Sequence, residues 1–122
     1  MLTAHLARRA GFGATRDELD RYVSMGYEAV LEELLHPGDP QHIPDDVIHR
    51  RFPEYHTQMN VFDANALWAY RMVTTKCPFL EKVALLWHGV FATGNDKLLN
   101  PVSLLNQLDM FREYGMGRLD DL

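Results

Sequence analysis

Apolar residues recur at intervals of three and four along most of this chain, which is the pattern of amphipathic α-helices. No segment alternates apolar and polar residues as a half-buried strand does, and no hairpin turn is evident. The sequence therefore predicts an all-α protein, an irregular orthogonal bundle of about five helices with one long loop.

Capping residues mark several helix boundaries. Thr15 and Glu18 have the spacing of a capping box, in which each side chain bonds the other's backbone N–H. Gly26 separates that helix from the next, which Pro37-Gly38 ends. Pro78 suits the first turn of a later helix, because a backbone N–H there would have no partner within the helix.

The segment 78–95 is the most apolar of the predicted helices. Nine apolar residues nearly encircle it: Phe79, Leu80, Val83, Ala84, Leu85, Leu86, Trp87, Val90 and Phe91. We expect a helix of this composition to be buried and central.

The segment 38–60 shows no sustained periodicity and contains three prolines, so we expect an irregular loop. It also holds His42, His49 and His56, spaced by seven residues. That spacing would align them on a helix, but Pro53 interrupts it and no apolar stripe accompanies them. We expect these histidines to be solvated.

Composition and charge argue against several classes of function for this chain. The net charge of −5 and pI near 5.6 argue against a nucleic-acid surface. No run approaches the roughly 20 apolar residues of a membrane span, and the first residues lack the apolar core of a secretory signal. Cytoplasm is thus the default location.

Cys77 stands alone, which excludes an internal disulfide and a cysteine zinc site. We expect no metal and no cofactor.

Three residues are candidates for catalysis: His88, Glu81 and Arg71. Glu81 and His88 lie about two turns apart on one side of the predicted helix. His88 could act as a general base or as a single metal ligand. The alternative, which we favour, is a core histidine bonded to a backbone carbonyl, with Glu81 paired to Arg71 or Arg112, because a metal site needs three or four ligands.

A second group of candidates precedes the helix that begins after Thr15. Arg8 and Arg9 beside the glycines Gly11 and Gly13 could bind an anion such as phosphate or sulfate. The pattern lacks the lysine and spacing of a phosphate loop and follows a helix rather than a strand. We favour a helix terminator whose arginines pair with nearby carboxylates.

The end of the sequence carries information about organisation. Residues 117–122 begin a new amphipathic segment, which stops after barely one turn. We therefore expect a single helical domain over 1–122 that forms the amino-terminal part of a longer protein.

Several spaced motifs resemble a bacterial family catalogued as domain of unknown function 1800, and the resemblance covers almost the whole chain. The motifs are His5 to Thr15 (HLARRAGFGAT), Trp68 to Met72, Pro78, Glu81-Lys82, Trp87-His88 with Phe91 to Thr93, Gln107, and Phe111-Arg112.

The resemblance implies a mostly helical protein several hundred residues long, without an established activity. Many relatives are exported and encoded beside a sulfatase-related family, which implies a surface or periplasmic partner. The family often has a second histidine two positions after His88, where this chain has Val90, so a metal site on that pair is in doubt.

Two functions remain open for this chain. The leading one is a helical scaffold or protein-interaction segment, partnered by the remainder of the parent protein or by self-association through apolar helices. The alternative is part of a hydrolase-like enzyme, whose site is completed by residues beyond this chain.

Overall fold

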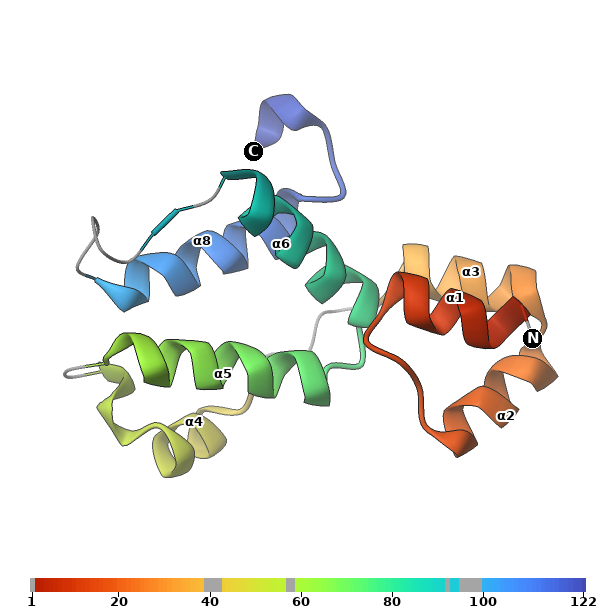
Figure 1. The fold of residues 1–122 in the computed structure, drawn as a ribbon, viewed down its shortest axis with the longest axis horizontal. Coiled ribbons are helices and arrows are strands. Elements are labelled where there is room, and N and C mark those ends of the chain that lie inside the picture. Colours follow the sequence, from red (N-terminus) through yellow and green to blue (C-terminus); the bar gives the residue numbers. More distant parts are fainter. Residues whose placement is uncertain (1, 39–42, 57–58, 92, 95–99) are drawn as a thin grey trace.

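The structure is a computed structural model that describes residues 2–38, 43–56, 59–91, 93–94 and 100–122. The all-α prediction is confirmed, since every regular element in these ranges is a helix (Figure 1). The α-helices are α1 (Leu2–Ala10), α2 (Arg16–Met25), α3 (Tyr27–Leu35), α4 (Asp45–Arg51), α5 (Val61–Thr74), α6 (Pro78–Phe91) and α8 (Pro101–Tyr114), and two short 3₁₀ helices are η1 (Pro53–His56) and η2 (Leu119–Asp121).

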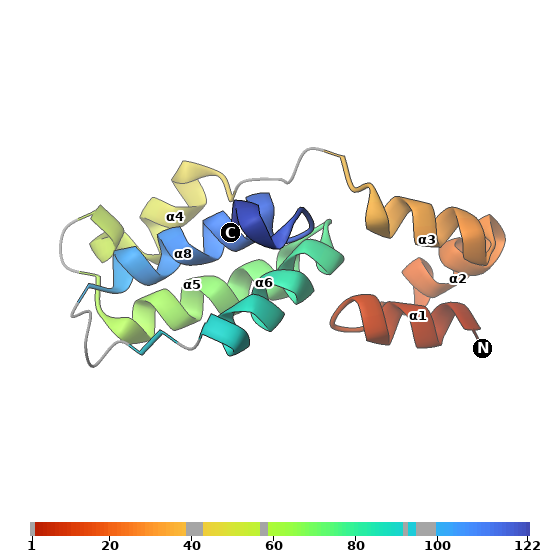
Figure 2. The ribbon, with the colours of Figure 1, turned by 90° about the horizontal axis from the view of Figure 1, so that it is seen from above.

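The helices form two groups along the long axis of the molecule. Helices α1, α2 and α3 lie at one end, and α4, α5, α6 and α8 lie at the other (Figures 1 and 2). Each group has its own cluster of buried apolar side chains. The first is built on Leu6, Ala7, Ala10, Tyr22, Val30 and Leu34, and the second on Ile48, Met59, Ala64, Leu67, Ala84, Leu105, Leu108 and Phe111.

The predicted capping box at the start of α2 is confirmed. The Thr15 hydroxyl accepts a hydrogen bond from the Glu18 backbone N–H at 3.3 Å, and the Thr15 backbone N–H donates to Glu18 Oε2 at 2.7 Å. The Thr15 backbone N–H and the Thr15 hydroxyl both donate to Glu18 Oε2, and these two bonds, the backbone one first, lower the pKa of Glu18. At the other end of α2, Gly26 has φ 85°, a conformation that glycine adopts at little cost.

The turn after α1 packs on the first turn of α6 and joins the two groups. A Cβ on Gly11 would lie 2.9 Å from Pro78 Cβ, so this approach requires a residue without a side chain. The Lys82 ammonium sits over the Phe12 ring, 5.0 Å from its centroid. Phe79 adds its side chain to the first apolar cluster. The first turn of α6 therefore contacts both halves of the fold.

Helices α6 and α8 meet through a close contact at the end of α8. The Trp87 indole N–H donates to the Gly115 carbonyl at 2.8 Å, and a Cβ on Gly115 would lie 2.8 Å from Trp87 Cδ1. The Phe91 ring stacks between those of Trp87 and Phe111, with centroids 5.8 Å from each. Gly115 therefore ends α8, as the sequence predicted, and its lack of a side chain leaves room for the Trp87 indole.

The prediction of an irregular loop over 38–60 is wrong in its middle. Residues 45–51 form α4, and residues 53–56 form η1. Helix α4 exists because Ile48 is buried in the second cluster, which one apolar residue achieves without the stripe that sequence periodicity detects. Tertiary packing therefore stabilises a helix that is too short for a periodic signal.

The prediction that the helix beginning at Pro78 is buried and central holds for one side of the helix and is wrong for the other. One side, with Glu81 and Ala84, is buried, whereas Leu85, Leu86, Val90 and Phe91 are exposed. Helix α6 packs mainly on α8, and within the described residues no other element covers its opposite side. The helix ends at Phe91. The sequence predicted helix through residue 95, but residues 93 and 94 are not helical, and residue 95 lies outside the described ranges.

Candidate functional site

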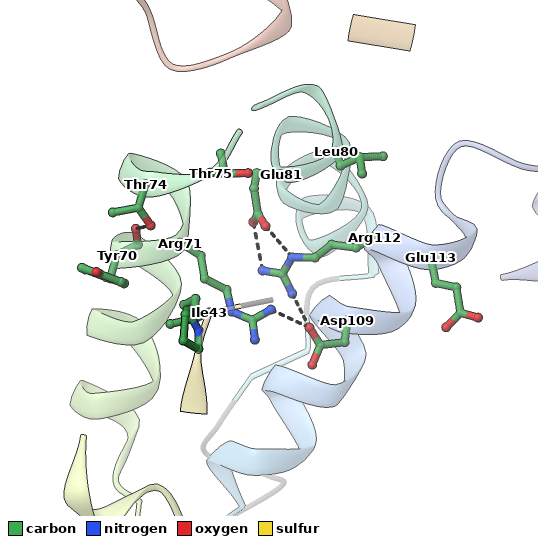
Figure 3. Close-up of a pocket in the computed structure, with 11 residues that line it drawn as sticks. Ile43, Tyr70, Arg71, Thr74, Thr75, Leu80, Glu81, Asp109, Arg112 and Glu113 are labelled. Carbon is green, nitrogen blue, oxygen red and sulfur yellow. Dashed lines mark hydrogen bonds and ion pairs between the residues drawn. The ribbon is translucent and has the colours of Figure 1, made fainter. Parts of the chain in front are cut away.

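A pocket of about 500 Å³ lies where the end of α5 and the start of α6 meet α8 (Figure 3). The segment before α4 forms another part of its wall. The lining residues are Ile43, Pro44, Tyr70, Arg71, Thr74, Thr75, Leu80, Glu81, Asp109, Arg112 and Glu113. Two of the three catalytic candidates predicted from the sequence, Arg71 and Glu81, are therefore in this pocket.

Glu81 and Arg112 form a two-point ion pair in the pocket wall. Arg112 Nε donates to Glu81 Oε1 at 2.6 Å, and Arg112 Nη2 donates to Oε2 at 2.9 Å. The two side chains are only 7% and 10% exposed, so the pair is largely removed from water. Of the two partners that the sequence offered for Glu81, the structure selects Arg112.

Asp109 links this pair to Arg71. Its Oδ1 accepts from Nη1 of Arg71 and from Nη1 of Arg112, both at 2.8 Å (Figure 3). The resulting chain runs from α5 through α8 to α6 and contains two guanidinium groups and two carboxylates. We call Arg71, Glu81, Asp109 and Arg112 the charged network. The charged network connects the three longest helices of the second group, α5, α6 and α8.

Sequence reasoning did not select Asp109, although a signal for it exists. Asp109 and Arg112 are three residues apart on α8, a spacing that brings side chains together on one helix face. Glu113 also lines the pocket, but its carboxylate points away from the charged network (Figure 3). A hydrogen bond with Glu113 raises the pKa of the adjacent Tyr114 phenol.

His88 lies outside the residues that line the pocket. Its ring meets Trp68 edge to face, with centroids 5.0 Å apart, while Glu81 on the same helix is held by Arg112. His88 Nδ1 is buried without a hydrogen-bond partner, so the expected bond to a backbone carbonyl is not made by that atom. The structure therefore does not join Glu81 and His88 into one acid–base pair.

Four buried side-chain atoms in the described residues have no hydrogen-bond partner: Trp68 Nε1, Arg71 Nε, His88 Nδ1 and Gln107 Oε1. Most buried polar groups in proteins are hydrogen-bonded, so such atoms call for an explanation. All four belong to the motifs that carry the family resemblance. The polar interior of α5, α6 and α8 is thus built largely from motif residues.

Arg8, Arg9, Gly11 and Gly13, which the sequence offered as an anion site, lie in the last turn of α1 and in the turn that follows it. Arg8 and Arg9 are both exposed, and neither forms an ion pair with a described carboxylate. Gly11 permits contact with Pro78, and Gly13 adopts φ 111° in the turn. Both glycines are explained by the end of α1 and its packing.

Of the three loop histidines, the structure describes the side chain of His49 alone. His49 is exposed on α4, as expected for a solvated side chain. His42 and the side chain of His56 lie outside what the structure describes. Across the described ranges no three His, Cys, Asp or Glu side chains gather in a way that could hold a metal ion. No helix in those ranges is both long and apolar enough to cross a bilayer.

A protein-family model matches residues 5–122 of this chain. The chain belongs to the family described as "Protein of unknown function (DUF1800)". The resemblance seen in the sequence motifs is thereby confirmed. Comparison with the curated proteins and with the solved structures finds no match to this chain.

Proposed function

We propose that this chain is a single helical domain that acts as a scaffold or protein-interaction segment within a longer protein. The observation that carries the proposal is the uncovered side of α6. Leu85, Leu86 and Val90 are 37%, 62% and 59% exposed. With Gly89, which has open space where a Cβ would be, they lie on one side of the helix. We call these four residues the α6 apolar face.

The exposure of this face favours a protein partner. Burying a Leu or Val side chain stabilises by about 1.5–3 kcal/mol, so a row of three contributes enough to hold a helix in place. Single exposed apolar residues are common on protein surfaces, whereas large contiguous apolar patches mark interaction sites. The partner that we propose is the remainder of a longer protein. A second copy of the chain is the alternative partner, from which experiments must distinguish it.

Dye binding and sedimentation test the proposal on the 122-residue chain. We expect the chain to bind the apolar-surface dye ANS and to associate as its concentration rises. The double substitution Leu86→Glu with Val90→Glu should reduce both. Val23→Glu is the matched control, because Val23 on α2 is exposed to a similar degree, 64%. A compact monomer without dye binding, or an equal effect of Val23→Glu, would contradict the proposal.

A second candidate function, hydrolysis, is favoured by one observation. His88 has a buried Nδ1 without a partner beside Trp68, and Arg71 and Glu81 of the same two helices line a pocket. In this reading residues beyond the chain complete the site. Replacing a general base reduces the rate by about 100-fold or more. His88→Asn in the complete gene product, assayed on p-nitrophenyl acetate, should show that loss, whereas His49→Asn should not. Equal rates for His88→Asn and the unmodified protein would exclude the assignment.

A further inference from the structure

The guanidinium groups of Arg71 and Arg112 share one hydrogen-bond partner, Asp109, but differ in the partners of their Nε and Nη2 atoms. Each donates Nη1 to the same oxygen of Asp109. Arg112 also uses the edge formed by Nε and Nη2, which holds both oxygens of Glu81. The corresponding edge of Arg71 has no such partner. Arg71 Nε is buried and unbonded, and no described residue accepts from Nη2.

This edge of a guanidinium presents two parallel N–H groups at a spacing that matches the two oxygens of a carboxylate. The Arg112–Glu81 pair shows that geometry in the same pocket wall. A buried donor without an acceptor is destabilising, so a group that accepts from this edge would bind favourably. The chemistry required of that group is a planar pair of oxygen acceptors.

The remaining walls of the pocket define the rest of the ligand. Ile43, Pro44 and Leu80 supply apolar surface, and Tyr70 and Thr74 supply hydroxyl groups at its edge. A volume of about 500 Å³ lies in the range of small-molecule sites, about 300–1,000 Å³. Glu81 and Asp109 are both bonded to arginines, so the charged network is neutral and the outward-pointing Glu113 is the remaining acid of the lining.

We propose that this pocket binds a small organic carboxylate with an apolar body, held through the Nε and Nη2 edge of Arg71. The carboxylate lies against Arg71, and the apolar body contacts Ile43 and Pro44. The proposal is independent of the interaction function of α6, because the α6 apolar face does not line the pocket.

Nuclear magnetic resonance titration of the 15N-labelled chain with benzoate tests this site. We expect saturable shifts of the Arg71 Nε–H resonance and of backbone amides over 70–75. Benzamide has the same apolar body without the charge, and inorganic phosphate has the charge without the apolar body. Both should bind at least about tenfold more weakly, which corresponds to about 1.4 kcal/mol. Phosphate binding as tight as that of benzoate would overturn the assignment to an organic carboxylate.

Two variants change the pocket in different ways. Arg71→Gln removes the two-point donor, and Thr74→Phe fills the pocket while leaving all arginines in place. Both should weaken benzoate binding by at least about tenfold. Arg118→Gln and Val73→Phe are the matched controls, because both residues are exposed and lie outside the pocket lining, and they should leave the affinity unchanged. Unsaturable shifts, or equal affinity in Thr74→Phe and the unmodified chain, would overturn the proposal.

Discussion

Glu81 of α6 and Arg112 of α8 are joined by two hydrogen bonds of 2.6 and 2.9 Å in a largely buried position. This pair fixes the register of the two helices that pack most extensively on each other. It also supplies one wall of the pocket and holds Arg112 where Asp109 can bridge to Arg71. The charged network therefore connects α5, α6 and α8 and also forms part of the pocket wall.

Breaking this pair should destabilise the fold strongly. Glu81→Gln leaves the Arg112 guanidinium with Asp109 as its single carboxylate, and the loss of one partner of a buried pair costs about 3–5 kcal/mol. We expect the free energy of unfolding in urea to fall by about 3 kcal/mol. The exposed pair Arg118–Asp120 gives the control, since Asp120→Asn should change stability by less than about 1 kcal/mol. A comparable small effect for Glu81→Gln would show that the pair is not buried in solution.

Two glycines should respond to alanine in opposite directions. In Gly115→Ala the new methyl group would press on the Phe111 carbonyl and on the Trp87 indole, and overpacking of this kind costs about 1–3 kcal/mol. In Gly89→Ala the methyl group meets open space inside α6, where alanine is favoured over glycine by about 0.5–1 kcal/mol. Thermal unfolding of both variants would measure the contrast. Stabilisation by Gly115→Ala would refute the close contact with Trp87.

The capping box at α2 predicts a pH dependence. The bonds from Thr15 lower the pKa of Glu18 from its ordinary value of 4.5, because they favour the charged carboxylate. A carboxyl group with a lowered folded-state pKa stabilises the fold above its unfolded pKa, and that contribution is lost as the pH falls through the folded pKa. Stability from this cap should therefore decline as the pH falls below about 4.5.

Thr15→Ala isolates the side-chain part of this effect. It removes the hydroxyl but keeps the backbone N–H that bonds Glu18, so the Glu18 pKa should rise only part of the way to its ordinary value. The loss of the cap should cost about 1 kcal/mol near neutral pH. A carbon-detected titration of the Glu18 carboxyl would measure the pKa, and an unchanged pKa in Thr15→Ala would contradict the bonding seen here.

The sequence predicted the local features of this fold better than its long-range contacts. The Thr15–Glu18 cap, the Pro78 start and the Gly115 stop were correct because each depends on residues close together in the chain. Helix α4 was missed because a single buried residue, Ile48, holds it, and that contact comes from tertiary packing. Periodicity alone gave no sign of it.

Burial of α6 was overestimated because composition does not say which sides of a helix have neighbours. Leu86 and Val90 match a core pattern, yet no described element packs on them. For the pocket, the sequence offered Glu81 with either arginine but could not choose between them. The link from Arg71 to Asp109 spans 38 positions, and a single sequence contains no signal for such a contact.

The central claim, that the α6 apolar face is covered by protein, is tested most directly by thiol labelling in the product of the complete reading frame. Leu86→Cys and Val23→Cys place thiols at positions of similar exposure in this chain, 62% and 64%, and native Cys77 is buried. We predict that the thiol at 86 reacts at least about tenfold more slowly than the thiol at 23, because a reagent cannot reach a packed side chain. Equal labelling rates at the two positions would contradict the claim.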